Sequence, residues 1–219
     1  MGSGASSPPA SEVSLEVFAS DDFPVLEVES SQLTTSDQLA RSLEPFLAKP
    51  FRLSAQEQDI ETLPELDLPG SLVSLDLTSN NGLKFQSLQG ILSRPSSLHE
   101  LLLPSCPNLY EAPLGAAPGL GRLLSLDLSF ISRVKTSLLL ALFAQTPALQ
   151  KLALESCEIP SLTVKPEAGP EAFLLASLSP TLQQLNLGDN LFDDITYING
   201  LSALTSLKEL DLREVRQCG

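Results

Sequence analysis

The chain has 219 residues, of which 42% are apolar, and it carries a formal net charge of −14. That length is enough for one well-filled core or for one linear array of repeats. The negative charge disfavours nucleic acid as a partner, because a phosphate backbone is bound by clustered Lys and Arg side chains. The lack of Trp and the frequent leucines favour a repetitive aliphatic core.

Cysteine usage and hydropathy indicate the compartment. The cysteines at 106, 157 and 218 are an odd number without close pairing, which favours a reducing environment. The longest apolar run, 138–143, is far shorter than the roughly 20 residues of a membrane helix. The first residues also lack the charged and then apolar pattern of a signal peptide. We therefore expect a cytoplasmic protein.

The pattern Leu-x-x-Leu-x-Leu-x-x-Asn/Cys recurs six times. Each copy predicts one short strand whose first, fourth and sixth side chains enter a core that neighbouring copies share. The first leucines of successive copies are 26, 25, 26, 33 and 25 residues apart. By first, fourth, sixth and ninth residue, the copies are Leu72, Leu75, Leu77, Asn80; Leu98, Leu101, Leu103, Cys106; Leu123, Leu126, Leu128, Ile131; Leu149, Leu152, Leu154, Cys157; Leu182, Leu185, Leu187, Asn190; and Leu207, Leu210, Leu212, Val215.

The ninth position of each copy is expected to turn into the core. There the side chains of Asn80 and Asn190 would bond backbone groups of the turn that sheet pairing leaves unpaired. Cys106 and Cys157 occupy the same position, and we expect them to be small buried thiols with a structural role rather than reactive or metal-binding groups.

The segments between the strands carry helical patterns. Leu88, Ile91 and Leu92 have the spacing of one helix face, and 138–143 is apolar nearly all round, as in a helix packed on a core. Ile195, Ile198 and Leu201 predict a further helix. The longest interval holds about seven extra residues in 162–172, with Pro166, Gly169 and Pro170, and we expect a surface loop there.

We divide the chain into a disordered tail at 1–12, an acidic cap with two atypical repeats at 13–71, and six regular repeats at 72–219. Val13, Leu15 and Val17 alternate as in a strand. Phe23 and Ala48 are taken as the first positions of the two atypical repeats. Up to residue 68 there are 13 acidic and 3 basic residues. Few residues follow the last strand, so we expect either a fragment or a partner over that end.

From Phe23 to Val215 the pattern resembles the leucine-rich repeat superfamily. The resemblance implies an α/β solenoid, or horseshoe, with parallel strands on the concave face, helices on the convex face, and protein binding as the function. The cysteines at the ninth position resemble the repeats of F-box substrate adaptors. The closing stretches 185–190, 199–201 and 206–207 are similar to the repeat domain of the tubulin-folding cofactor E family, which implies tubulin as one candidate protein partner and a cytoskeletal association.

The outward positions of the strands are mostly polar and acidic, with a few apolar residues among them. This mixture is typical of a protein-binding face, although Asp on such strands also fits an ordinary solvated surface. The candidate partner-binding residues on the concave face are Asp76, Glu100, Leu102, Leu124, Asp127, Phe130, Lys151, Asn186, Asp189, Glu209 and Asp211.

Little in the sequence predicts catalysis, a cofactor or a metal site. The lone histidine, His99, is expected on the surface, and no phosphate-binding glycine loop or metal-ligand spacing is present. Asp193–Asp194 predicts a turn or helix start. Gly2, with Ser6, fits the pattern for N-myristoylation. The same Gly- and Ser-rich residues also fit a flexible tail or linker. The alternative to a free binding module is therefore a membrane-tethered structural component of a larger complex.

Overall fold

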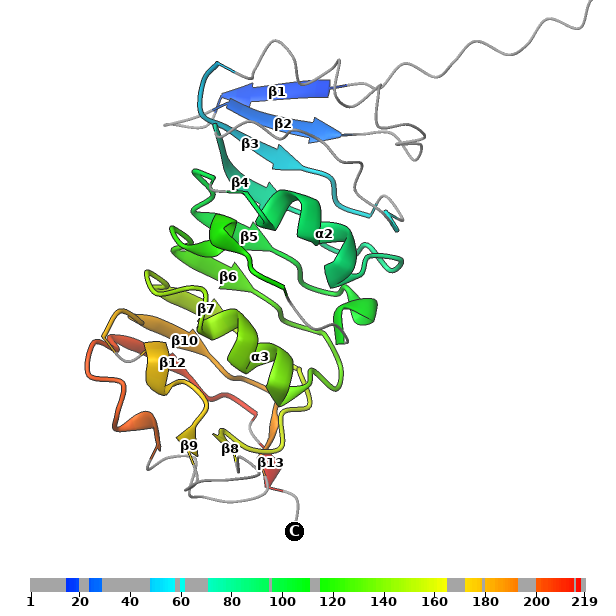
Figure 1. Ribbon diagram of the computed structural model, residues 1–219. Helices are drawn as coiled ribbons and strands as arrows, with labels where there is room; N and C mark the ends of the chain where they lie inside the picture. The colour runs from blue at the N-terminus through cyan, green and yellow to red at the C-terminus, as the bar shows by residue number, and fades with distance from the viewer. Residues whose placement is uncertain are drawn as a thin grey trace, which may run out of the picture.

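The computed structural model describes residues 15–19, 24–28, 48–57, 60–61, 71–94, 96–110, 115–164, 172–178, 180–192, 200–214 and 216–217. Within these residues the chain is an α/β protein built on one nine-stranded sheet. The strands, in their spatial order, are β1 (Leu15–Ala19), β2 (Pro24–Val28), β3 (Phe51–Ser54), β4 (Leu72–Asp76), β5 (Glu100–Leu102), β6 (Ser125–Asp127), β7 (Lys151–Ala153), β10 (Gln184–Asn186) and β12 (Glu209–Asp211). They follow one another along the molecule in chain order (Figure 1).

Within this nine-stranded sheet the pairs from β2 to β12 are all parallel, and β1 pairs antiparallel with β2. The fourth-position leucines of the six regular repeats stand opposite one another in register, as the repeat spacing predicts. Those of β4, β5, β6, β7 and β10 are almost completely buried. The apolar side chains of the repeats therefore form one continuous core along the sheet.

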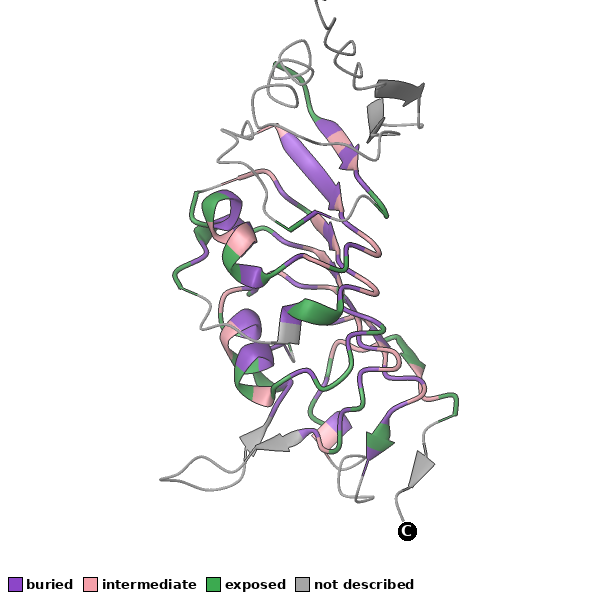
Figure 2. Ribbon diagram, turned by 90° about the vertical axis from the view of Figure 1, so that its right-hand side faces the viewer, coloured by how far each residue is buried: buried purple, intermediate pink, exposed green. Residues whose placement is uncertain are grey.

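Two α-helices, α2 (Phe85–Leu92) and α3 (Thr136–Phe143), lie on the same side of the sheet (Figure 2). In α2 the residues Leu88, Ile91 and Leu92 are buried, which confirms the helix face predicted from their spacing. In the described part of the return between β5 and β6 the helical segments are the 3₁₀ turns Pro107–Tyr110 and Pro118–Leu120. A further helix is predicted from Ile195, Ile198 and Leu201. The first two of these residues lie outside the described part of the chain.

Where the ninth residue is Asn or Cys, its side chain ties the repeat to the preceding one. Asn190 Nδ2 donates to Leu154 O at 2.7 Å, and its Oδ1 accepts from the amides of Cys157 and Ile159 at 3.2 and 3.0 Å. Asn80 Nδ2 makes the equivalent bond to Ala55 O at 2.8 Å. These bonds confirm the predicted role of the buried asparagines.

The two ninth-position cysteines donate to the same carbonyl position. Cys106 Sγ lies 3.1 Å from Leu77 O, and Cys157 Sγ lies 3.2 Å from Leu128 O. Both thiols are free and buried, as expected. A thiol makes one weak bond where asparagine makes several, because it carries only one S–H donor.

The eighth position of all six regular repeats has a left-handed backbone. Its φ is 59° at Ser79, 57° at Ser105, 63° at Phe130, 53° at Ser156, 49° at Asp189 and 56° at Glu214. This conformation turns the chain out of the strand so that the ninth side chain enters the core. It is uncommon for residues other than glycine, and unusual for a bulky side chain such as Phe130.

The same feature corrects the sequence-based register of β3. Glu57 has a φ of 57°, which makes Pro50 the first position of that repeat. Leu53 accordingly pairs with Leu75, and Ala48, the predicted first position, is exposed. The prediction was wrong by two residues. A shift of two keeps the same side chains on the same face of a strand, so the alternation of apolar residues did not reveal the error.

The longest interval between repeats is partly ordered. Thr163–Val164 (β8) and Ala172–Phe173 (β9) form an antiparallel pair, and Leu162 is completely buried. The prediction of a surface loop over 162–172 is therefore wrong at its two ends. The stretch 165–171 between them lies outside the described residues.

At the last strand of the sheet the core is partly open. Leu210 of β12 is 43% exposed, whereas its register partner Leu185 is 2% exposed. Beside the main sheet, Leu191–Phe192 (β11) pairs in parallel with Arg216–Gln217 (β13). Phe192 is completely buried, so β11 contributes to covering this end of the core.

We predict that Asn190→Ala lowers the free energy of unfolding by about 3 kcal/mol, because buried amides and carbonyls lose their partners. Urea denaturation measures this change. The control is Asn108→Ala, which removes an exposed bond to Asn81 O and should change stability by less than about 0.5 kcal/mol. Equal losses in the two variants would contradict the proposed importance of the ninth-position bonds.

Candidate functional site

The face of the sheet turned away from α2 and α3 (Figure 2) is here called the open face. The strand register places its side chains in ordered rows. Because the strands are in register, equivalent positions of neighbouring repeats lie side by side, about 4.8 Å apart. The third-position row runs Ser74, Glu100, Ser125, Lys151, Gln184 and Glu209, and the fifth-position row runs Asp76, Leu102, Asp127, Ala153, Asn186 and Asp211.

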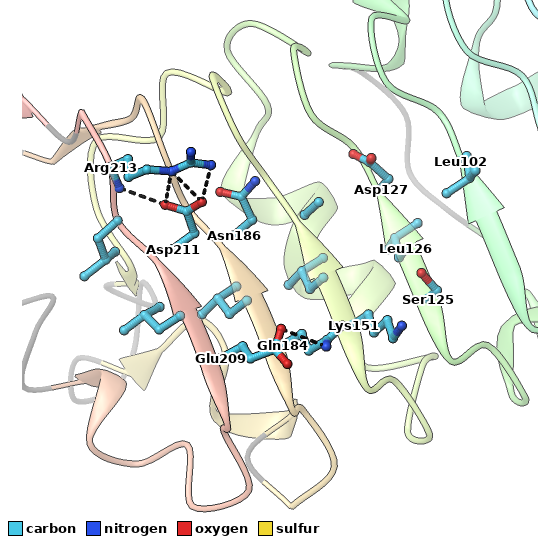
Figure 3. A pocket seen from close by; sticks show the side chains of 15 residues that line it. Leu102, Ser125, Leu126, Asp127, Lys151, Gln184, Asn186, Glu209, Asp211 and Arg213 are labelled. Atoms are coloured by element: carbon cyan, nitrogen blue, oxygen red, sulfur yellow. Dashed lines mark hydrogen bonds and ion pairs between the residues drawn. The ribbon is translucent and has the colours of Figure 1, made fainter.

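A first hollow on the open face encloses about 890 Å³ and crosses β5, β6, β7, β10 and β12. Figure 3 shows that its polar side chains stand in the two rows just described, apart from Arg213, which follows β12. It brings together six of the eleven predicted binding residues, namely Leu102, Asp127, Lys151, Asn186, Glu209 and Asp211. In the fifth-position row, Leu102 and Ala153 alternate with the polar members, so the hollow combines apolar and polar surface.

The polar side chains of the fifth-position row have a structural role that the sequence analysis missed. Asp127 Oδ1 accepts from the amide of Ser129 at 2.8 Å, and Asn186 Oδ1 accepts from the amide of Gly188 at 2.9 Å. Asp76 and Asp211 make the same bond to the amides of their i+2 residues at 3.0 Å. Each side chain therefore stabilises the turn that leaves its strand, as Asp and Asn commonly do.

Asp211 is further held by a salt bridge within its own turn. The guanidinium of Arg213 lies 2.6 Å from Asp211 Oδ2. Its hydrogen bonds lower the pKa of the Asp211 carboxyl below its usual value. At neutral pH this end of the first hollow therefore carries a paired carboxylate rather than a free negative charge.

Three predicted residues lie outside both hollows of the open face. The carboxylate of Asp76 accepts hydrogen bonds from Gln56 Nε2 at 2.6 Å and from the amide of Thr78 in its own turn. Asp189 accepts from Ser156 Oγ at 2.8 Å in the turn after β10. Phe130 lies in the corresponding turn after β6 and is 50% exposed. The structure does not bring these three residues together with the rest.

A second hollow, of about 570 Å³, lies towards the beginning of the strands and crosses β3 to β7. It contains the predicted residues Glu100, Leu124 and Lys151. It also contains Pro50, Arg52, Val73, Ser74 and His99, which the sequence analysis did not assign to a binding site. The register error at β3 is one reason, because it placed Arg52 opposite Asp76 instead of Ser74.

Arg52 is the unusual residue of the second hollow. Its Nε is buried and has no hydrogen-bond partner within the described part of the chain. An arginine is always charged in proteins, and leaving such a donor buried without an acceptor costs about 1–3 kcal/mol or more. A buried unpaired donor in a hollow is a signal for a missing acceptor.

The described residues offer little for chemistry. They contain no group of three or more His, Cys, Asp or Glu side chains that could hold a metal ion. Burial raises the pKa of Cys157 to about 12 and also raises the pKa of Cys106, so neither thiol is a nucleophile at neutral pH. His99 is exposed, as expected.

Two further sequence predictions fall on residues that the structure does not describe. These are the lipidation candidate Gly2 and the pair Asp193–Asp194. Among the described residues, no helix combines the length and the apolar character needed to cross a membrane.

Comparison with known proteins does not extend the assignment. No protein-family model matches the chain, and no curated protein matches it at a significant level.

We predict different effects for two substitutions of Asp127. Asp127→Asn keeps the acceptor for the Ser129 amide and should change the free energy of unfolding by less than about 0.5 kcal/mol. Asp127→Ala removes the acceptor and should cost about 1 kcal/mol. Thermal or urea denaturation distinguishes the two. An equal cost for both substitutions would mean that charge, rather than turn stabilisation, is what this position requires.

We predict that the stability of the protein falls as the pH rises from 9 towards 12, in part because of Cys157. The unfolded thiol ionises near its ordinary pKa of 9.0, whereas the folded thiol stays neutral up to about 12. The unfolded state therefore binds fewer protons in this window, and unfolding is favoured. Urea titrations at pH 8 and 11 should show a smaller loss for Cys157→Ala than for the wild type. An equal loss in the two proteins would contradict the buried, neutral thiol.

Proposed function

We propose that this chain is a leucine-rich repeat solenoid that binds another protein through its open face and has no enzymatic activity. In this arrangement the parallel strands line the concave side and the helices lie on the convex side. Three recurring features support the assignment: the in-register leucines, the left-handed eighth residue and the buried Asn or Cys at the ninth.

The observation that carries the binding proposal is the first hollow. It extends over five strands, and partly exposed Leu102 and Ala153 lie among polar side chains. Protein interfaces combine apolar contacts with a polar rim in this way. Because most of the polar groups in its fifth-position row are already held by turns, Leu102, Ala153 and the third-position residue Lys151 remain as the groups available to a partner.

We further propose a cytoplasmic location, with tubulin as one candidate partner. The two buried free thiols support a reducing compartment. Tubulin rests on the similarity of the stretches 185–190, 199–201 and 206–207 to the repeat domain of the tubulin-folding cofactor E family. The last two strands of the sheet, β10 and β12, belong to this region and line the first hollow.

We predict that Ala153→Arg abolishes partner capture while the fold is retained. Ala153 lies between Asp127 and Asn186 in register, so an arginine there projects into the first hollow beside a carboxylate. Such a residue should weaken a partner at least tenfold, by excluding its surface. The measurement is affinity capture from cytosolic extract, with purified tubulin tested in parallel.

The matched control is Leu140→Arg, which places the same charge on an exposed position of α3 on the other side of the sheet. Circular dichroism verifies that both variants are folded. Partners retained by the wild type and Leu140→Arg but lost by Ala153→Arg would support the proposal. If all three proteins capture the same partners, the open face is not the binding surface. If purified tubulin does not bind the wild type, tubulin is excluded as the partner, while the proposed binding surface is unaffected.

A further inference from the structure

The second hollow contains two cations, Arg52 and Lys151, that have no counter-ion among the described residues. Arg52 extends from β3, between the buried residues Phe51 and Leu53, and therefore points to the open face. Its Nε has no hydrogen-bond partner, and neither Arg52 nor Lys151 forms a hydrogen bond or ion pair with any described residue. Lys151 lies on β7, at the other end of the same hollow.

The described acidic side chains of β4 and β5 that lie nearest to Arg52 have other partners. Glu100 Oε2 accepts from the hydroxyl of Ser74 at 2.7 Å. The carboxylate of Asp76 is bonded to Gln56 and to Thr78. In a chain with a net charge of −14, a pair of unneutralised basic side chains in one hollow is unusual, and it is complementary to an anion.

The hollow is also the more apolar of the two on the open face. Pro50, Val73 and Leu124 line it between the two basic residues. Val73 is 8% exposed although its strand position faces away from the core, so it forms a floor rather than a projecting contact. A ligand that fills this hollow therefore has to combine an apolar group with a negative charge.

The dimensions fit a short stretch of extended polypeptide. The hollow crosses five strands, and neighbouring strands are about 4.8 Å apart, so it spans about 19 Å. An extended chain advances about 3.3 Å per residue, so about six residues would reach across it.

From these observations we propose that the second hollow binds an extended segment of the partner protein in which an acidic side chain lies near an apolar one. Arg52 is the carboxylate-binding residue, because its guanidinium presents paired N–H donors that match a carboxylate. Val73 and Leu124 receive the apolar side chain, and Lys151 adds a second positive charge. This inference rests on the proposed protein-binding function and specifies the chemistry of the segment bound.

The test begins with a displayed library of random peptides selected on the full chain. We expect the selected sequences to be enriched in Asp or Glu close to an aliphatic or aromatic residue. The best peptide is then synthesised with a fluorescent label, together with a version in which its acidic residue is changed to the amide. Fluorescence anisotropy gives the affinity of both peptides for the wild type and for Arg52→Met.

The amide peptide should bind the wild type about tenfold more weakly than the acidic peptide. It should bind Arg52→Met with the same affinity as the acidic peptide does, because the group that distinguishes them is gone. Arg52→Met keeps an unbranched side chain at this position and removes a charge whose Nε is buried without an acceptor, so it should fold as well as the wild type. The matched control, Lys208→Met, removes an exposed cation outside the hollow that bonds Gln183, and should keep the wild-type preference.

The inference is overturned if the selected peptides show no enrichment in acidic residues, if no peptide is selected, or if Arg52→Met still prefers the acidic peptide. These results are separate from a failure of the proposed function. The capture experiment with Ala153→Arg tests the first hollow and does not depend on Arg52. If Ala153→Arg loses the partner and Arg52→Met still prefers the acidic peptide, the proposed binding function stands. The inference of an acidic segment in the second hollow is then excluded.

Discussion

In four of the six regular repeats the turn after the strand directs backbone groups into an apolar core, where the ninth-position side chain bonds them. In two repeats an asparagine does so with several hydrogen bonds, and in two others a cysteine does so with its thiol. In every case the side chain donates to a backbone carbonyl of the preceding repeat, 25 to 36 residues earlier in the chain. A buried polar group without such a partner would be costly. This bond therefore holds successive repeats in one register, and the continuous leucine core follows from it.

The fixed register in turn arranges the open face. Equivalent residues of neighbouring repeats stand in rows, so a surface is built from single residues that are 25 or more positions apart in the chain. In the fifth-position row most polar side chains serve the turns below them, as Asp127 does for Ser129. The two repeats that lack such a side chain, at Leu102 and Ala153, leave apolar gaps in the row. Some repeats of the row thus stabilise their turns, and the others leave apolar surface that the proposed partner could contact.

The distribution of charge separates the two hollows. Around Asp211 the carboxylate is paired with Arg213, and this pairing lowers its pKa. Around Arg52 the opposite holds, because the described acidic side chains nearby bond to Ser74 and Gln56, and Arg52 Nε is buried without an acceptor. An acidic protein that keeps an unneutralised arginine in an apolar hollow has a local preference opposite to that of its overall charge. That contrast is the reason for assigning the two hollows different contacts with a partner.

The leucine spacing alone was sufficient to predict the six regular strands, their inward residues and the buried roles of Asn80 and Asn190, because a period of about 25 residues admits only one way to bury them together. It was not sufficient for β3. Placing the repeat at Ala48 or at Pro50 leaves the same side chains facing inward, and only the pairing of Leu53 with Leu75 decided between them. The tertiary structure also decided which carboxylates are used by turns and that Arg52 has no acceptor. These properties depend on hydrogen bonds between side chains and backbone across neighbouring strands, whereas the sequence pattern records only which face of its own strand a residue occupies.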